Sequence, residues 1–364
     1  MSFNLPDYPM PDFDAPRFKN APGVRTLPVQ KEGIAPENYH AMSIFPEFFK
    51  IGNRWILPEG SRMDCVPVLR GGGDEAQIDI VEFRRLRPGD AVIIGRTEDG
   101  SEGIYVDSCA FVDRESGDAF EFRSGRSRET SYSRDYDDLY ELLRWERLHG
   151  YIVWVLGPAV SFDYDSRLSM TRLIEEGYVH ALLAGNALAT HDLEGALLQT
   201  ALGQDIYTQE NRPNGHYNHL DLLNAARSCG SIENLIREKN LSDGIVHAAL
   251  KKGVPTVFAG SIRDDGPLPE VLGNVYEAQD AMRVHARKAT TVIALATQLH
   301  TIAVGNMTSS YILREGRVRP VYFYSVDISE FAVNKLRDRG TLSAIPIVTN
   351  IQDFLVHLKN NLTE

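Results

Sequence analysis

The segment of this sequence best equipped for chemistry is PTVFAGSIRDDGPLPE, Pro255 to Glu270. Its β-favouring run Thr256 to Ala259 is broken by glycine and serine, which predicts a buried strand that ends in a loop. Ligands of open α/β sheets bind beyond the carboxyl ends of such strands. The loop supplies a small residue, a hydroxyl group, a fixed cation and two carboxylates: Gly260, Ser261, Arg263, Asp264 and Asp265. We expect a binding crevice here, although a solvated turn with an Arg–Asp pair explains the same residues.

Three other segments are predicted to be strand ends with small or polar residues: AGN (184–186), VGNM (304–307) and VDIS (326–329). Small residues leave room for a ligand near the backbone, and a carboxylate at a strand end can bind ribose hydroxyls. We expect Asp327 to take that role, although it would also serve as a helix N-cap. The residues expected to contact a nucleotide cofactor are Gly185, Asn186, Ala187, Gly260, Ser261, Ile262, Gly305, Asn306, Met307, Asp327, Ile328 and Asn350.

The glycine fingerprint GxGxxG is absent from the sequence. A standard Rossmann dinucleotide site is therefore not predicted. Any nucleotide is expected to bind a different kind of doubly wound sheet.

Histidines and acidic residues cluster in two further segments. His191, Asp192 and Glu194 follow AGN, and His216 and His219 lie in GHYNHL. Both segments are expected at the crevice side of the sheet, where these side chains would bind substrate or cofactor. Two histidines three residues apart, together with HDxE, also suit a divalent ion. Because neither HExxH nor a carboxylate-bridged spacing is present, we predict no metal.

The order of predicted elements divides the chain into an arm and two domains. Residues 1–30 hold many prolines and aromatic residues without periodicity, which indicates an extended N-terminal arm. Residues 31–130 contain short strand-like runs between Gly, Asp and Pro, which predict a small β-rich domain. From residue 150 to 364 strands alternate with helices, as in a doubly wound, mostly parallel α/β sheet. A helical insert is expected at about residues 204–253.

Composition narrows the partners. The 364 residues carry 38 Lys and Arg against 50 Asp and Glu, a net charge of -12, which argues against nucleic acid and anionic membranes. Cys65, Cys109 and Cys229 lack CxxC spacing, which favours buried thiols in a reducing cytoplasm over disulfides. Neither a signal peptide nor a membrane-spanning run is found. The aromatic arm favours a homo-oligomer.

The end of the sequence is similar to the closing unit of the NAD-binding sheets of the deoxyhypusine synthase type. The similarity rests on VYFYSVDIS, a helix, and then IPIVTNIQDFLVHL. It implies that Asp327 meets the adenosine ribose. In that type a Gly-Asp pair after the next strand closes over the adenine, whereas this sequence has Thr349 and Asn350.

The second half, from about Ile152 to Leu358, resembles the archaeal-type, or alternative, ornithine cyclodeaminases. This family shares a region with lysine-ketoglutarate reductase/saccharopine dehydrogenase proteins and with the C-terminal part of cyanobacterial arginine-degrading enzymes. The resemblance rests on HALLAGNALATHDLE, GHYNHLDLLNAARSCGSI, VPTVFAGSIRDDGPLPE, HTIAVGNM and SVDISEFAVNKLRDRG. It implies tightly held NAD and conversion of ornithine to proline with loss of ammonia.

Such a reaction needs a cation for the substrate carboxylate and an acid–base group near the amines. We expect Arg263 in the first role and Asp264 or Asp265 in the second, with His191 and His216 as further catalytic candidates. Lysine, a hydroxylated ornithine and a guanidino amino acid remain alternative substrates, and TQENRPNGHYNHLD is where specificity is expected. Two other functions stay open: a non-catalytic NAD or amino-acid sensor, and an NAD-dependent transferase of the deoxyhypusine synthase kind.

Overall fold

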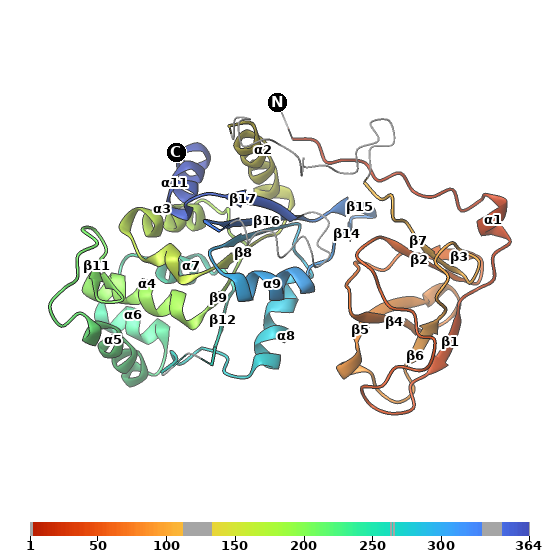
Figure 1. The fold of residues 1–364 in the computed structure, drawn as a ribbon, viewed down its shortest axis with the longest axis horizontal. Helices are drawn as coiled ribbons and strands as arrows, with labels where there is room; N and C mark the ends of the chain where they lie inside the picture. Colours follow the sequence, from red (N-terminus) through yellow and green to blue (C-terminus); the bar gives the residue numbers. More distant parts are fainter. Residues whose placement is uncertain (1–2, 112–132, 263, 265, 330–343, 364) are drawn as a thin grey trace.

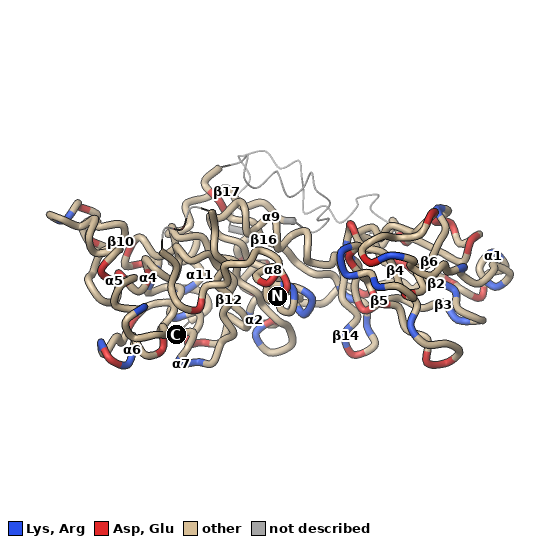
Figure 2. Tube along the Cα trace, turned by 90° about the horizontal axis from the view of Figure 1, so that it is seen from below, with Lys and Arg blue, Asp and Glu red and all other residues tan. Residues whose placement is uncertain are grey.

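The computed structural model describes residues 3–111, 133–262, 264, 266–329 and 344–363. They form a β lobe and an α/β lobe that lie side by side (Figure 1). Charged residues of both signs are interspersed over the two lobes (Figure 2). Within the described residues, no helix combines the length and apolar character needed to cross a membrane.

The β lobe consists of two antiparallel sheets. The first sheet has the order β1 (Arg25–Pro28), β6 (Ala91–Ile94), β4 (Cys65–Arg70), β5 (Gln77–Glu82). The second has the order β3 (Arg54–Ile56), β2 (Glu47–Ile51), β7 (Ile104–Val106). The small β-rich part is thus confirmed, and GGGD (71–74) lies in the hairpin loop between β4 and β5. The end of the predicted β-rich domain, from residue 112 to 130, lies outside the described residues.

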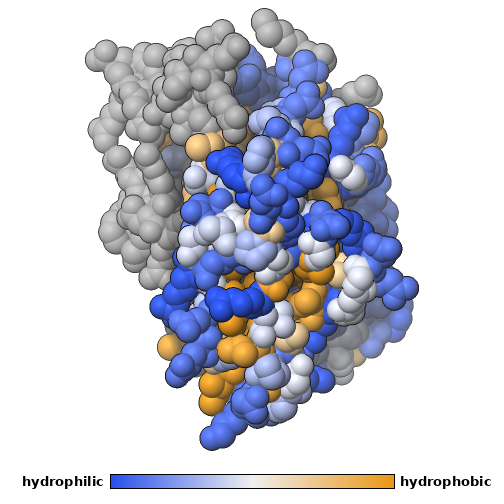
Figure 3. Space-filling view, turned by 90° about the vertical axis from the view of Figure 1, so that its right-hand side faces the viewer, coloured by the Kyte–Doolittle hydropathy of each residue, from blue (hydrophilic) through white to orange (hydrophobic). Residues whose placement is uncertain are grey.

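The N-terminal arm packs on its own chain. Phe3 contacts Trp145 of the α/β lobe with ring centroids 5.4 Å apart, whereas Phe13 stacks on Trp55 of the β lobe at 5.1 Å. The arm continues through α1 (Pro16–Lys19) into β1, which pairs with β6. Viewed end-on, the β lobe is largely hydrophilic, with apolar side chains showing in the lower half (Figure 3).

The α/β lobe is built on a six-stranded parallel sheet. Its order is β12 (Thr256–Ala259), β9 (Ala181–Gly185), β8 (Ile152–Leu156), β13 (Thr291–Leu295), β16 (Tyr322–Asp327), β17 (Ala344–Val348). Numbered along the chain, this is the order 3-2-1-4-5-6 of the Rossmann fold. The doubly wound, mostly parallel sheet is confirmed. The missing glycine motif, from which a non-standard sheet was expected, concerns one loop and does not determine strand order. The deoxyhypusine synthase-like subtype stays a prediction.

The two faces of this sheet bury alternate residues of each strand. In β8, Ile152, Trp154 and Leu156 enter one core, whereas Val153 and Val155 enter the other. Among the helices that contribute to the first core are α2 (Ser133–His149), α3 (Tyr164–Glu175), α4 (Asn186–Leu198), α7 (Ile245–Lys252) and α11 (Ile351–Leu362). The second core is closed by α8 (Val275–Ala286) and α9 (Gln298–Met307), which lie on the opposite side from α3 and α11 (Figure 1).

The helices α5 (His216–Cys229), α6 (Ile232–Lys239) and α7 fall within the range of the predicted helical insert and follow the short strands β10 (Thr200–Ala201) and β11 (Gln204–Asp205). Two predictions further along the chain were wrong. The apolar run TTVIALATQL (290–299), whose pattern predicts one core strand, ends as a strand at Leu295, and VGNM, predicted to be a strand end, is the end of α9. The apolar residues after Leu295 continue the strand pattern, but Ala296 takes a left-handed φ of 49° and a helix begins.

A second hairpin, β14 (Tyr311–Arg314) with β15 (Arg317–Pro320), precedes β16 and joins the lobes. RPVYFYSVD is therefore two strands rather than one. Leu313 N donates to Glu59 O at 2.9 Å, and Ser61 N donates to Ser309 Oγ at 2.7 Å. Of the three cysteines, Cys65 is buried as predicted and Cys109 is exposed.

Buried charges also hold the lobes together. Glu82 of the β lobe pairs with Arg62 and with Arg283 of α8, and all three side chains are about nine-tenths buried. Burial would raise the pKa of Glu82, but the two guanidinium groups outweigh it and lower that pKa below its usual value. The carboxylate therefore stays ionised between two buried cations.

We expect Glu82→Gln to lower the free energy of unfolding by about 3 kcal/mol, because it leaves buried arginines without their counter-charge. Urea unfolding monitored by tryptophan fluorescence measures this change. Glu75→Gln, in the exposed hairpin loop, is the control and should change stability by less than about 0.5 kcal/mol. Equal midpoints for the two variants would contradict the prediction.

Candidate functional site

The loop after β12 leaves the sheet and returns beside it. Gly260 N donates to Leu272 O, and Leu272 N donates to Phe258 O, both at 2.9 Å, so residue 272 extends the sheet edge. Leu268 N donates to Asn186 Oδ1 at 3.0 Å, which fixes the middle of the loop to the start of α4. Glu270 accepts a hydrogen bond from Ile232 N at the start of α6. The helical insert thus supports the loop that carries the predicted acid–base residues.

Asp264 is the predicted catalytic residue that the structure places in this loop. Its Oδ2 accepts a hydrogen bond from Ser261 N at 2.8 Å, and its own N donates to Ser261 O at 3.1 Å. These bonds form a tight turn that leaves Ile262 fully exposed at its tip. Arg263 and Asp265, the other two catalytic candidates of this loop, lie outside the described residues.

His300, in the first turn of α9, is within electrostatic reach of Asp264 and was missed by the sequence analysis. A Cβ on Gly185 would come within 2.8 Å of His300 Cε1, so the imidazole lies against the carboxyl end of β9. Its Nδ1 is 3.4 Å from Thr297 Oγ1. Burial lowers the pKa of His300, and the nearby carboxylate of Asp264 acts in the opposite direction. The signal that would have found it is the helix start after Leu295.

The chain reverses the direction of strand addition between β8 and β13, where ligands of this fold bind. The two strand ends meet closely there, since Gly157 N donates to Leu295 O at 2.8 Å. A Cβ on Gly157 would lie 2.0 Å from the carbonyl oxygen of Ala296. The left-handed Ala296 is thus pressed against a residue that has no side chain. A strained residue at such a position is typical of functional sites.

Gly157→Ala should destabilise the protein by about 1–3 kcal/mol, because the clash involves backbone that has no rotamer with which to escape. The matched control is Gly273→Ala, where an added Cβ meets no atom within 4 Å. Thermal unfolding of both variants measures the difference. A melting temperature of Gly157→Ala equal to that of the control would show that the two loops separate easily.

The small residues at the strand ends mainly accommodate protein atoms rather than leaving open space. The space beside Gly185 is taken by His300, and a Cβ on Gly260 would come within 3.2 Å of Leu272 O. Asn186 is buried, with its Oδ1 accepting from Leu268 N, and Ala187 lies in the first turn of α4. On the side where a Cβ would project, the space next to Gly185 and Gly260 is filled by protein atoms and is not open to a ligand.

The remaining cofactor candidates are at two places. Gly305, Asn306 and Met307 lie in the last turn of α9, where Asn306 O accepts from Arg62 Nε of the β lobe at 3.2 Å. They do not follow the end of β13, contrary to the reasoning that selected them. Asp327 and Ile328 do follow β16, with Asp327 Oδ1 accepting from Ser329 N at 2.9 Å and Ile328 77% exposed. Asn350 caps α11 through Gln352 N.

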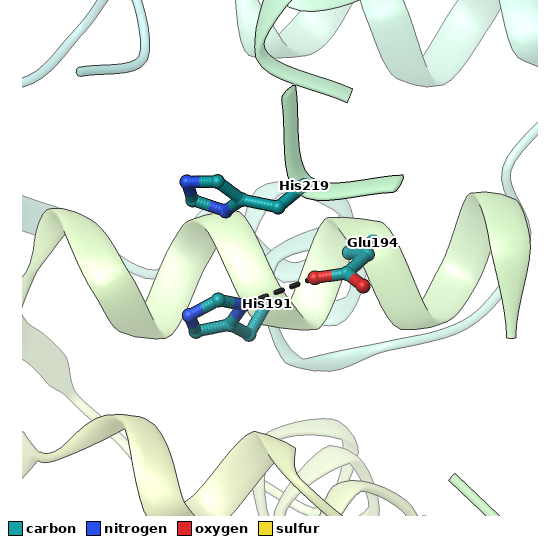
Figure 4. Close-up of side chains that lie close together, drawn as sticks. All are labelled: His191, Glu194 and His219. Atoms are coloured by element: carbon teal, nitrogen blue, oxygen red, sulfur yellow. Dashed lines mark hydrogen bonds and ion pairs between the residues drawn. The ribbon is translucent and has the colours of Figure 1, made fainter. Parts of the chain in front are cut away.

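His191, Glu194 and His219 come together on one side of α4 (Figure 4). Glu194 Oε2 accepts from His191 Nδ1 at 3.0 Å, and the other ring nitrogen of His191 points away from it (Figure 4). The His191 and His219 ring centroids are 5.3 Å apart. One ligand atom from each residue lies within 4.8 Å of the others, a spacing that would suit a metal.

Glu194 already uses its acceptor positions within the protein. Besides His191, it accepts hydrogen bonds from Thr200 Oγ1 at 2.7 Å, Leu202 N at 3.2 Å and Gly203 N at 3.1 Å. Burial would raise its pKa, but these donors outweigh burial and lower it. A carboxylate has about four acceptor sites, so binding a metal would cost one of these bonds. The geometry fits a buried network that ties β10 to α4.

Asp192 and His216, the neighbours of this network, have different environments. Asp192 Oδ1 accepts from Arg167 Nε at 3.0 Å, and its two carboxylate oxygens accept the first two N–H groups of α7. It is fully buried and structural. His216 begins α5, is exposed and lies against Tyr217 with centroids 4.3 Å apart. Among the described residues, no hydrogen bond or ion pair joins His216 to Asp264.

The chain is similar to known proteins over nearly its whole length. The family model described as arginine dihydrolase ArgZ-like, C-terminal, Rossmann fold matches residues 139–358. The ornithine cyclodeaminase of Methanocaldococcus jannaschii is 36% identical over 346 residues, which cover 93% of this chain and 78% of the relative. The bifunctional arginine dihydrolase/ornithine cyclodeaminase ArgZ of Synechocystis is 33% identical over 350 residues, 94% of this chain but 47% of ArgZ.

Solved structures are also similar to this chain over nearly its whole length. A conserved LOR/SDH protein from Methanococcus maripaludis superposes with a TM-score of 0.83 at 34% identity, over 94% of this chain and 98% of that one. The complex of AgrE with ornithine and NAD+ matches with a TM-score of 0.56 at 30% identity, over 94% of this chain and 46% of AgrE.

Proposed function

Because this chain belongs to the family of the archaeal ornithine cyclodeaminases and the ArgZ-like C-terminal domains, we propose that it converts L-ornithine to L-proline and ammonium with NAD as a recycled cofactor. The observation that carries the proposal is geometric: the loop with Asp264, the start of α4 and the start of α9 meet at the carboxyl edge of a 3-2-1-4-5-6 sheet. The relative AgrE has been crystallised with ornithine and NAD+.

The residues at this edge fit a dinucleotide. The N-termini of α4 and α9 start at strand ends and have no side-chain cap, so their first N–H groups can bind a diphosphate. Asp327 at the end of β16 offers a carboxylate for ribose hydroxyls, beside the exposed apolar side chain of Ile328. When bound, NAD would supply a reversible hydride acceptor for the substrate α-carbon.

The chain's own residues would hold the substrate and exclude water. Arg263 is proposed to bind the substrate carboxylate and Asp265 to contact its amines. Asp264, whose Oδ2 accepts the Ser261 N–H, would place its carboxyl group near the reacting amines. The loop is fixed at Asn186 and Glu270, so Asp264 belongs to a supported segment.

Two finer features belong to the same proposal. The sheet is proposed to be of the deoxyhypusine synthase-like NAD-binding subtype, supported by the position of Asp327, which is the last residue of β16 and pairs with Val348, the last residue of β17. Self-association in the cytoplasm is proposed as well, since the exposed apolar side chains Leu299, Ile328 and Val348 would be covered by a second copy or by cofactor.

Proton NMR of the purified protein with L-ornithine and NAD tests the function. Proline and ammonium should appear in equal amounts, and reduced cofactor, followed by its absorbance, should not accumulate. Samples without NAD and samples with L-lysine are the controls. Unchanged ornithine alongside measurable NAD binding would favour a sensor, and reduced cofactor that accumulates with product would indicate a dehydrogenase.

A further inference from the structure

His300 lies where three parts of the candidate site meet. Its ring is in contact range of Gly185 at the end of β9, and its Nδ1 is 3.4 Å from Oγ1 of Thr297, the N-cap of α9 that follows β13. The carboxylate of Asp264, from the loop after β12, acts on it electrostatically. These segments are far apart in sequence, and the sheet order places the ends of β9 and β13 on either side of β8.

The backbone around His300 holds the imidazole in place. Ala296 and Thr297 form the left-handed turn from β13 into α9, and Gly157 packs on Ala296 from the neighbouring strand. Because Gly185 has no side chain, the ring can approach the start of α4. Because Gly185 and Gly157 both lack a Cβ, α9 can pack closely against the strand ends.

The electrostatic surroundings suit an acid–base group. Burial favours the neutral ring, while Asp264 favours the imidazolium. Among the described residues, Asp264 is the charged residue that shifts the pKa of His300 electrostatically, and it raises that pKa. A ring that is neutral at rest and is stabilised when it gains a proton can act first as base and then as acid.

We propose that His300 takes the proton from the substrate α-ammonium group and later returns it to the departing ammonia. This assignment rests on the proposed cyclodeamination. It names a residue and a role that the family relationship by itself does not supply. Asp264 is the positioning residue that stabilises the protonated ring.

The steps balance in atoms and electrons. His300 accepts one proton from the α-nitrogen, and a hydride leaves the α-carbon for the cofactor, which leaves an iminium. The side-chain amine, after losing a proton to solvent, adds to that carbon, and a proton then passes from the new ring nitrogen to the original nitrogen. The bond from the α-carbon to the original nitrogen breaks, with its electron pair going to nitrogen. Ammonia receives the proton held by His300. The returned hydride and one solvent proton complete proline, so ornithine cation gives proline and ammonium without net oxidation.

The test compares wild-type protein with His300→Asn and His300→Ala. We expect kcat to fall by about 10²–10⁴-fold in both, with NAD affinity measured by calorimetry unchanged. The acid limb of the kcat profile against pH should disappear in His300→Asn, and imidazole in the buffer should restore part of the rate of His300→Ala. A purely structural role would not give chemical rescue.

Each result decides one question. If wild-type protein makes no proline from ornithine, the proposed function fails. If wild-type protein does so and His300→Asn retains kcat within threefold, the assignment of His300 is overturned while the function stands. An unchanged acid limb, or no rescue of His300→Ala by imidazole, would also overturn it. Asp74→Asn, in the exposed β4–β5 hairpin loop of the β lobe, should behave as wild type in every assay.

Discussion

Asp192→Asn should lower the free energy of unfolding by about 3–5 kcal/mol. The effect is structural, because the contacts of Asp192 are with Arg167 and the start of α7. Asp192 is the counter-ion of Arg167, whose side chain is only 2% exposed, and its carboxylate accepts the N–H groups of Ile245 and Val246. An asparagine keeps one acceptor oxygen but removes the charge. A buried guanidinium and the first turn of α7 then lose their main stabilising partner.

Asp243→Asn is the matched control, because Asp243 pairs with the same arginine at 3.2 Å but is 56% exposed. An exposed partner contributes about 0–1 kcal/mol. Urea unfolding midpoints with equal slopes give both values. If the two variants are equally destabilised, or if Asp192→Asn is as stable as wild type, then the buried Arg167–Asp192 pair does not make the predicted contribution to stability.

Asp264→Asn should reduce kcat/KM at neutral pH by about ten- to a hundredfold, on the order of 1.4–2.7 kcal/mol of transition-state stabilisation. The carboxylate of Asp264 raises the pKa of His300 against the effect of burial. Without it the pKa of His300 falls. The acid limb of the pH profile is therefore expected to move to lower pH, while a weaker proton acceptor slows the reaction.

The readout is kcat/KM for ornithine measured over about pH 5–9, together with NAD affinity. Asp74→Asn, in the exposed β4–β5 hairpin loop, is the control and should leave the profile unchanged. An acid limb that stays in place in Asp264→Asn would mean that this carboxylate does not act on the titrating group.

The strands and most helices were predictable because local pattern determines them. β8, β9 and β12 are apolar runs that end at glycine, and α5, α6 and α7 each end at Gly or Asn in a left-handed conformation. The strand end after Leu295 was not predictable from pattern. Ala296 and Thr297 continue the apolar, β-favouring run, and only the packing of Gly157 against Ala296 explains why the strand stops there.

The candidate site was only partly predictable for the same reason. The sequence analysis selected Asp264 because it follows a strand, and the structure places it beside a histidine. It missed His300 because the strand end was misplaced by several residues. It also grouped Asp192 with site residues, since a buried ion pair and a catalytic carboxylate look alike in sequence. Only the three-dimensional contact with Arg167 distinguishes them.

Isotope labelling gives the most direct test of redox-neutral cyclisation. Ornithine carrying deuterium and ¹⁵N at the α position is incubated with the protein and NAD, and the products are read by NMR. The proposed reaction predicts that proline retains deuterium at its α-carbon while ¹⁵N appears in ammonium. Proline that retains the α-¹⁵N, or that has lost its deuterium to solvent, would contradict hydride transfer to and from the same carbon.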